Sequence, residues 1–532
     1  MNFTASKCSY DKTGYFSKLV TDYLNGHDFL KSFYAHPVSL AGFDAAIRAR
    51  EQFPTDRNTL VQVLEDFYRP LAVEERVNRN IRLLAEANTF TVTTAHQPAI
   101  FTGHLYFIYK ILHVIRLAEM LKEQYPDKHF VPVYYMGSED ADLDELGHIF
   151  LDGETVSWDT QQTGAVGRMS TKGLDSIVER IEGEFATQPF GSELVSMLRA
   201  AYLESDTIQM ATLKLLHRLF GRYGLLVLIA DDKRMKAQMK SVFRDDLLNH
   251  LSYQITREAN ERMENRYPVQ ANPREINLFY LKDQLRNRLE QQGENYRVVD
   301  SQISFSKPEL EAELEQFPER FSPNVILRGL FQETILPNIA FVGGGGELAY
   351  WLELKALFDH YHVPYPVLVL RNSFLLIREN WREKMNKAGL TVSNIFHAED
   401  ELLDQQVKEQ SEHQLNLRKE IADGEAYYDH LKRLAGSVDE TLAQHVESLR
   451  SKAMKSVVEL EKKILRAEKR NFSDLKNRIH EVREALFPNN ELQERIENFI
   501  PWYAAYGEGF IDLIYDHSLT MEQEFMVLTE IS

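Results

Sequence analysis

A polar segment at positions 94–104 has the composition of a small-molecule binding loop. It follows a run rich in β-branched residues and precedes a helical pattern, so it joins a strand end to a helix start. Exposed N–H groups and the positive helix end favour an anion there. Gly103 permits close backbone approach, and His96 and His104 can donate hydrogen bonds to a phosphate or carboxylate. In the alternative interpretation, these histidines only bond backbone carbonyl groups.

A second segment, 137–148, is crowded with carboxylates. Five Asp and Glu side chains fall within positions 139–145, directly after an apolar run. One interpretation is structural, because negative charge stabilises a helix start. In the other, Glu139, Asp140 and Asp142 face a pocket, grip an ammonium group or sugar hydroxyls, and supply a base. Such side chains can also hold a divalent metal, but nothing in the spacing demands one.

Four consecutive glycines at 343–346, followed by Glu347, form the third polar segment. Glycines let the backbone approach a ligand closely. The segment is not a Walker loop, because no Gly-Lys-Ser/Thr follows it, and it lacks the dinucleotide-binding glycine spacing. Alone it is a weak functional signal.

The elements that must position these segments are strands alternating with helices. Strands are predicted at 90–95, 130–136, 224–230, 339–342 and 365–370, with helices at 105–121 and 347–360. Apolar strands that alternate with helices predict an open parallel sheet covered on both faces. Ligands bind outside the carboxyl ends of such strands, which is where the three polar segments begin.

A long helical region follows the predicted sheet. Residues 371–487 contain no proline and three glycines. From 442 to 486 the apolar residues step by three or four, which predicts a coiled-coil seam, and the earlier run 401–434 is also helical. The pattern does not choose between an intramolecular hairpin and a dimer seam.

Length and composition bound the remaining possibilities. With 532 residues the chain is expected to hold more than one structural unit. The net charge of −19 disfavours nucleic acid as a partner. The one cysteine, Cys8, fits a reducing compartment. The absence of a signal-like N-terminus and of an apolar run of membrane-spanning length predicts a cytoplasmic protein with no membrane partner.

The order of the motifs resembles the bacillithiol-biosynthesis cysteine-adding enzyme family. The matching segments run along nearly the whole chain and comprise 94–110, 137–145, 322–332, 343–351, 366–371 and 492–495. The resemblance implies an α/β fold with an open parallel, Rossmann-like nucleotide-binding core similar to class I aminoacyl-tRNA synthetases, two insertions and a long α-helical coiled coil. The expected parts are core 1–155, insertion 156–217, core 218–249, insertion 250–319, core 320–383, stalk 384–498 and a docking segment 499–532.

The resemblance also implies a set of site residues. The expected catalytic residues are His96, Glu139, Asp140 and Asp142. The expected substrate-binding residues are Gln97, Thr102, Gly103, His104, Lys110, Asn324, Arg328, Gln332, Gly343, Gly344, Gly346, Glu347, Tyr350, Trp351 and Arg371. No metal is expected.

By the same resemblance, the expected function is a ligase that adds L-cysteine to glucosaminyl-malate in the last step of bacillithiol biosynthesis, through an activated cysteinyl carboxyl group. ATP or another nucleotide is implied by analogy, and a homodimer through the coiled coil is expected. Two rival classes stay open. A synthetase-like RNA-charging or nucleotidyl-transfer enzyme is disfavoured by the negative charge, and a non-catalytic coiled-coil scaffold by the density of polar groups at strand ends.

Overall fold

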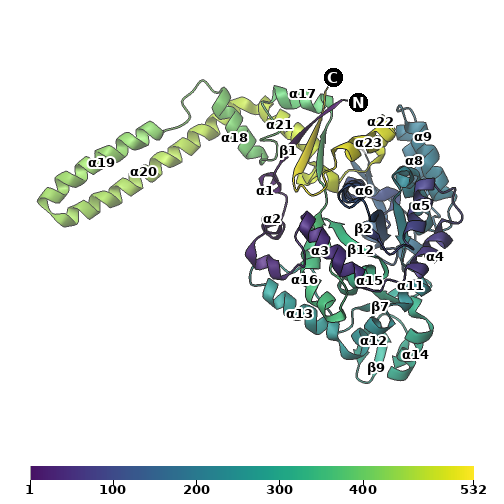
Figure 1. Cartoon of the computed structure of the whole chain (residues 1–532). Helices are drawn as coiled ribbons and strands as arrows, with labels where there is room; N and C mark the ends of the chain where they lie inside the picture. The colour runs from purple at the N-terminus through teal and green to yellow at the C-terminus, as the bar shows by residue number, and fades with distance from the viewer. Residues whose placement is uncertain (1, 152, 532) are drawn as a thin grey trace.

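Five parallel strands form the central sheet of the molecule (Figure 1). The computed structural model describes residues 2–151 and 153–531. The strand order is β13-β12-β2-β3-β6, which confirms the predicted open parallel sheet. Along the sequence, β2, β3 and β6 are added toward one edge of the sheet, and β12 and β13 toward the other edge. The direction of the strand order therefore changes between β2 and β12. The strands are β2 Thr89–His96, β3 His129–Met136, β6 Leu226–Ile229, β12 Asn338–Gly343 and β13 Val367–Leu370.

Helices cover both faces of this sheet. On one face, Phe43 of α3 and Val114 of α6 share an apolar cluster with Phe90 of β2. On the other, Phe341 of β12 packs on Trp351 of α16, with ring centroids 4.6 Å apart. Right-handed crossovers that run toward opposite edges of a parallel sheet place their helices on opposite faces of it. The helices are α3 Leu40–Glu51, α6 Leu105–Gln124 and α16 Gly345–Tyr361.

Two insertions interrupt the sheet. The first, between β3 and β6, is mostly helical and contains the predicted stretch 156–217. The second, between β6 and β12, carries an antiparallel sheet of order β10-β9-β8-β7-β11. The first contains α7 Leu143–Leu146, β4 His148–Leu151, β5 Glu154–Ser157, η3 Val166–Arg168, α8 Asp175–Phe185, α9 Gly191–Leu198 and α10 Ile208–Phe220. The second contains α11 Lys233–Ala237, α12 Lys240–Asn249, α13 Leu251–Met263, β7 Leu278–Lys282, β8 Leu285–Gln292, β9 Asn295–Val298, β10 Ser304–Ser306, α14 Lys307–Gln316, η6 Pro318–Arg320, β11 Phe321–Pro323 and α15 Val325–Ile335.

A third sheet joins the two ends of the chain, which lie side by side (Figure 1). Strand β15 pairs antiparallel with β1 and parallel with β14, which directly follows the core. The last segment thus packs on the body instead of extending from it. The elements are β1 Phe3–Cys8, β14 Phe374–Ile377, α22 Ile500–Tyr506, α23 Glu508–His517 and β15 Phe525–Glu530. The N-terminal helices are α1 Tyr10–Thr13, α2 Lys18–Leu24, α4 Arg57–Tyr68 and α5 Glu75–Leu83.

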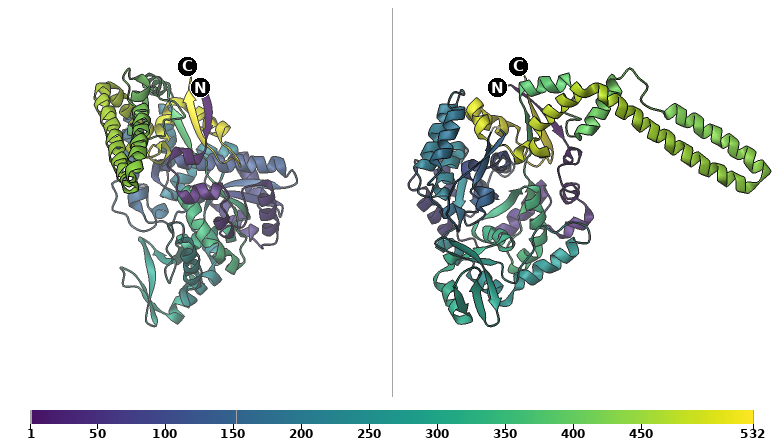
Figure 2. Two further views of the ribbon diagram at one scale, coloured as in Figure 1. Left: turned by 90° about the vertical axis from the view of Figure 1, so that its left-hand side faces the viewer. Right: turned by 180° about the vertical axis from the view of Figure 1, so that it is seen from behind.

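The stalk is an antiparallel hairpin of α19 and α20 that projects from the body (Figure 2). The apolar pattern predicted one helix over 442–486, but α20 ends in a turn of 3-10 helix at Arg470–Phe472. The reason is a change of partner. The side chains of α20 are all at least partly exposed, whereas α21 leaves the hairpin and buries Leu475 and Ile479 against the body. The helices are α17 Glu379–Lys387, α18 Glu399–Gln410, α19 Arg418–Val438, α20 Glu440–Lys469 and α21 Ser473–Leu486.

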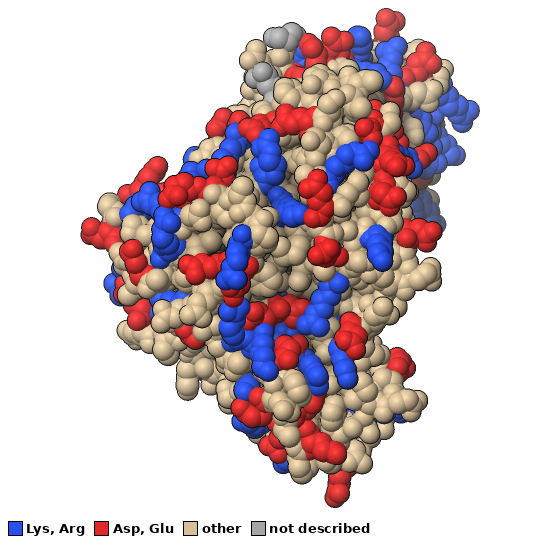
Figure 3. Space-filling view, turned by 90° about the vertical axis from the view of Figure 1, so that its right-hand side faces the viewer, with Lys and Arg blue, Asp and Glu red and all other residues tan. Residues whose placement is uncertain are grey.

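Charged side chains of both signs are interspersed over the face that carries α4 and α11 (Figure 3). Arg234, for example, pairs with both Asp66 and Asp232. In the described part of the chain, no helix is long and apolar enough to cross a membrane.

Candidate active site

A cavity of about 680 Å³ lies at the carboxyl ends of β2, β3 and β12, beside the point where the strand order diverges. Open α/β sheets bind their ligands at such a place. Twelve of the sequence-predicted residues line it: His96, Gln97, Lys110, Glu139, Asp140, Asn324, Arg328, Gly344, Gly346, Glu347, Tyr350 and Arg371.

The end of β2 presents a neutral imidazole to this cavity. His96 Nε2 lies 3.3 Å from the hydroxyl of Tyr106. Burial, with Lys110 nearby, holds the pKa of His96 well below its ordinary value. His96 can therefore orient a substrate by hydrogen bonding, but it is not a proton donor of the imidazolium type near neutral pH.

The glycine segment begins α16 at the opposite wall. The Glu347 carboxylate accepts a hydrogen bond from the Gly344 backbone N–H at 2.8 Å and pairs with Lys110 at 2.5 Å. Lys110 also donates to the Ala95 carbonyl group, so its charge ties β2 to the glycine segment. Beside Gly346 there is open space where a side chain would begin. A ligand can therefore approach the first backbone N–H groups of α16 closely.

Two arginines stand beside this helix start. Arg328 donates to the Tyr350 hydroxyl at 2.6 Å and lies over the ring of Tyr135, yet makes no ion pair with any residue that the structure describes. Arg371, in contrast, is neutralised by Glu494, 2.7 Å away. Arg328 is thus the cation of this wall that is available to an anionic ligand.

The acidic segment divides between the two interpretations that the sequence allowed. Glu139 lines the cavity and pairs with the buried Lys236. Asp140 also lines it, accepts from Gln97 at 3.1 Å, and lies 3.7 Å from Arg286. Asp142 instead accepts from the Glu145 backbone N–H at the start of α7, which is the capping arrangement.

The rest of the 94–104 loop is covered by the chain itself. The Leu105 N–H donates to the Glu497 carbonyl at 2.8 Å, and Asn498 donates to the carbonyls of Phe101 and Gly103. These bonds occupy the start of α6, where the sequence predicted an anion.

Three predicted residues of this loop therefore lie outside the cavity lining. His104 Nδ1 lies 3.1 Å from the Ile496 carbonyl, as in the alternative interpretation of a histidine bonded to backbone. Thr102 is buried, and Gly103 adopts φ 63°, packed so that a Cβ would lie 2.9 Å from Ala99.

Three further predicted residues lie behind the wall. Gln332 is buried, accepts from Arg328 and donates to Glu333. Trp351 is fully buried in the aromatic core under α16, and Gly343 packs against the ring of Phe341. These positions support the cavity from behind and do not line it.

The cavity is also lined by residues outside the set of expected site residues. Arg286 comes from β8 of the second insertion, and its guanidinium carbon lies 4.0 Å from the ring centroid of Phe279. No sequence motif includes Arg286. Arg495 comes from the segment after the stalk, within the family-like motif 492–495, which was a usable signal. The other new lining residues include Tyr106, Tyr135, Glu145, Gln270 and Gly345.

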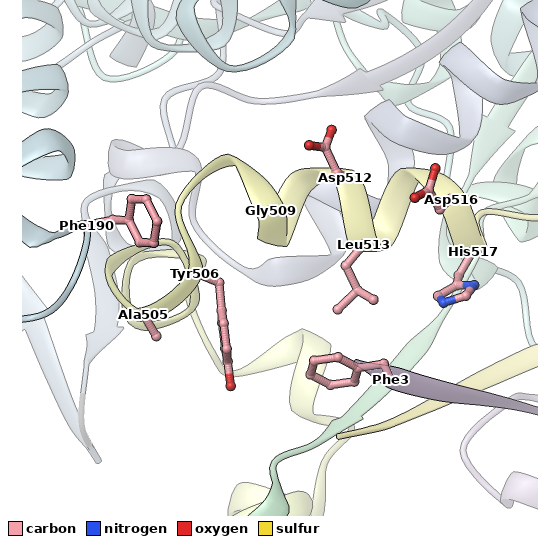
Figure 4. Close-up of a pocket in the computed structure, with 9 residues that line it drawn as sticks. All are labelled: Phe3, Phe190, Ala505, Tyr506, Gly509, Asp512, Leu513, Asp516 and His517. Atoms are coloured by element: carbon pink, nitrogen blue, oxygen red, sulfur yellow. The ribbon is translucent and has the colours of Figure 1, made fainter. Parts of the chain in front are cut away.

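Other chemistry-bearing features lie away from this cavity. Within residues 2–151 and 153–531, no group of three or more His, Cys, Asp or Glu side chains is arranged to hold a metal ion. Burial raises the pKa of Cys8 to about 11, so its thiol is not an activated nucleophile. A second hollow, beside α22 and α23, has the apolar side chains of Phe3, Phe190 and Leu513 around it (Figure 4). Of its two lining carboxylates, Asp512 and Asp516, the first is paired with Arg222.

Fold and cavity together define a Rossmann-like α/β protein with a cavity lined by charged residues at the carboxyl ends of its parallel strands. The chain belongs to the bacillithiol-biosynthesis BshC family. Residues 2–372 match the N-terminal Rossmann-like domain of bacillithiol biosynthesis BshC, and residues 374–530 match its C-terminal coiled-coil domain.

Curated relatives are similar over almost the whole chain. A protein of Christiangramia forsetii named "Putative cysteine ligase BshC" is 39% identical, over 98% of each chain. A protein of the same name from Flavobacterium johnsoniae is 38% identical, over 98% of this chain and 99% of its own. A solved structure titled as a putative arginyl-tRNA synthetase from Campylobacter jejuni covers 82% of this chain and 94% of its own, at 10% identity and a TM-score of 0.21.

Proposed function

We propose that this protein is a carbon–nitrogen ligase that joins the carboxyl group of L-cysteine to the amine of glucosaminyl-malate. One observation carries the proposal: a single cavity is lined both by the carboxylates Glu139 and Asp140 and by arginines that make no ion pair with a described residue. Glu139 and Asp140 suit an ammonium group, and Arg328 and Arg495 suit carboxylates. Both proposed substrates carry an amine and at least one carboxylate. Cysteine is proposed as one substrate because the curated relatives are named cysteine ligases.

Amide formation from a free carboxylate is uphill in water, so we propose that the cysteinyl carboxyl group is activated first. ATP would supply this activation by turning the carboxylate into a mixed anhydride. The start of α16 fits a phosphate, because the backbone beside Gly346 is open and Arg328 is not paired with a carboxylate. His96 and Gln97 would orient the acyl group, and the site would act chiefly by positioning its two substrates.

The direct test is to incubate the pure protein with cysteine, glucosaminyl-malate and ATP and to look for the coupled thiol by mass spectrometry. We expect product with a mass equal to the two substrates less one water. Omission of ATP should abolish it, and serine in place of cysteine is the matched control for the amino acid. Product formation without any nucleotide would refute the ATP step, and no product under any condition would refute the ligase.

Arg495 gives the proposal a residue-level prediction. This exposed side chain lines the cavity and makes no ion pair with a described residue, so we assign it to a malate carboxylate. Loss of such a contact is worth roughly 1.5–3 kcal/mol. Arg495→Gln should therefore raise KM for glucosaminyl-malate by about tenfold or more, with KM for cysteine little changed. Arg470→Gln, in the turn after α20, is the control; equal effects of the two variants would contradict the assignment.

We also propose a homodimer through the stalk. Leu442, Leu449 and Leu460 stand seven and eleven residues apart, which places them within about 20° of one another around α20. They are 42%, 43% and 51% exposed in the hairpin, so the seam with α19 does not cover them. A second copy would bury this stripe.

Leu449→Glu with Leu460→Glu should then convert the dimer to monomer in sedimentation at tens of micromolar, because each glutamate would be desolvated at the interface. Thermal stability of the body should be unchanged, since these side chains are exposed in the single chain. Ser451→Glu with Lys462→Glu, on the other side of the helix, is the control. A wild-type protein that sediments as a monomer would overturn the proposal.

We propose that the reaction takes place in the cytoplasm, because the sequence has one cysteine, Cys8, and a free thiol fits a reducing compartment. We propose no nucleic-acid or membrane partner. The rival scaffold function is disfavoured by the polar cavity, and the rival RNA-charging function by the net charge of −19.

A further inference from the structure

A buried cluster of charges lies directly behind Glu139. The Lys236 ammonium is fully buried and pairs with the Glu139 carboxylate, with the Asp231 carboxylate at 3.2 Å, and with the Glu319 carbonyl at 3.0 Å. Arg168 binds Asp231 through two hydrogen bonds of 2.6 and 2.7 Å. The cluster is therefore an alternating chain of charges that ends at the cavity wall.

Residues far apart in the sequence build this cluster. Asp231 follows the end of β6 and Lys236 lies in α11, while Arg168 comes from η3 of the first insertion and Glu319 from η6 of the second. The neighbouring parallel strands β3 and β6 end side by side, which brings Glu139 and Asp231 to the same lysine. The side chains of Asp231 and Lys236 are 2% and 0% exposed, so the ion pair between them is buried.

Glu139 is the member of the cluster that can reach a ligand. It lines the cavity, and only its Oε1 atom accepts a hydrogen bond from a residue that the structure describes. The Oε2 atom is therefore available to a substrate. We propose that Lys236 and Asp231 are positioning residues, which hold Glu139 at this wall as the ionised base that takes a proton from the attacking amine. This inference rests on the ligase function proposed above.

The proton balance of the step is simple. The sugar amine arrives as an ammonium ion and gives one proton to Glu139. The free amine then forms its bond to the carbonyl carbon of the activated cysteine, the bond from that carbon to the phosphate-type leaving group breaks, and a second proton leaves the new amide nitrogen for solvent. Glu139 returns its proton to solvent before the next cycle. The carboxylate must be ionised at the start of each cycle.

Opposing effects on the pKa of Glu139 suit this role. Burial raises the pKa of its carboxyl group, Lys236 lowers it, Asp231 raises it, and Arg286 lowers it. A carboxylate whose pKa is raised toward the operating pH is a better base, provided that it remains ionised. The other charged groups around the cluster are Arg168, Asp140 and Glu319. Lys236 thus prevents burial from protonating Glu139.

A structural role and a positioning role predict different results for two variants. Lys236→Met removes the cation, so the pKa of Glu139 rises and the acid limb of kcat/KM for glucosaminyl-malate should move to higher pH, by roughly 1–3 units. Asp231→Asn removes the like charge, so the same limb should move to lower pH. The substrate amine titrates identically with every variant, and shifts between variants therefore report on the protein.

Lys240→Met is the matched control. Lys240 lies four residues further along and pairs with Glu315 at 2.6 Å, away from the cavity, so its pH profile should equal that of the wild type. Opposite shifts for the two cluster variants support the inference. Unshifted profiles, or shifts of the same sign, overturn it, and if Lys236→Met does not fold, the downward shift of Asp231→Asn decides alone. A wild-type protein without coupling activity would instead refute the ligase function, so the two failures are distinguishable.

Discussion

Glu139→Gln is expected to lower kcat for cysteine addition by about 10²- to 10⁴-fold, the usual contribution of a general base. Glutamine keeps the size and the hydrogen-bonding oxygen of the side chain but cannot take up a proton at neutral pH. The fold should survive, because Lys236 keeps its contacts with the Asp231 carboxylate and the Glu319 carbonyl group. Product assays at fixed times measure kcat, and thermal unfolding of the same preparation measures whether the fold survives.

Two variants of the same acidic segment serve as comparisons. Asp144→Asn removes an exposed carboxylate outside the cavity lining and should leave kcat unchanged. Asp140→Asn changes a lining residue that holds Gln97 and faces Arg286, and we expect about a tenfold or greater loss of activity with near-normal melting. If Glu139→Gln keeps wild-type turnover, or loses it only together with the fold, Glu139 is not the base.

Arg50→Met is expected to lower the free energy of unfolding by roughly 3–5 kcal/mol, because it leaves the buried Glu333 carboxylate without its cation. Arg50 and Glu333 have side chains that are 1% and 0% exposed and lie 2.8 Å apart. Arg50 also donates to the backbone carbonyls of Glu333 and Pro364 at 2.7 and 3.0 Å. This pair fastens α3 to α15, the helix that carries Arg328 of the cavity.

Chemical denaturation of matched variants checks this expectation. Arg48→Met, two residues earlier on the same helix, removes an exposed pair with Asp44 and should change the unfolding free energy by at most about 1 kcal/mol. Combining Arg50→Met with Glu333→Gln should recover part of the loss, since the uncompensated charge is then gone. Equal losses for Arg48→Met and Arg50→Met would show that the buried pair contributes no more than a surface pair.

Local patterns predicted the central sheet well. Each of the five parallel strands is a short run of apolar or β-branched residues, whereas their order in the sheet comes from the tertiary structure. The polar segments 94–104, 137–148 and 343–346 all contribute residues to the cavity, because the carboxyl ends of parallel strands meet at one edge. Their roles in catalysis stay predictions until the variants above are measured.

Contacts between distant segments could not be predicted in the same way. The loop 101–104 looked open to an anion, yet 496–498 covers it across almost 400 residues of sequence. Arg286 reaches the cavity from a strand of the second insertion, and Lys236 reaches Glu139 from a helix that carries no motif. A contact made by one side chain leaves no periodic pattern in the sequence, so local patterns cannot predict which distant residue it will touch.

The sequence by itself thus determined the class of the sheet, the helical stalk and the family, since these depend on repeated local spacing and on ordered motifs. Only the tertiary structure decided which polar groups meet. It neutralised Lys110 and Arg371 with Glu347 and Glu494, and it left Arg328 without a carboxylate partner in the described chain. The physical reason is that the charge available at a site depends on burial and on ion pairing in space, and both come from segments that only folding brings together.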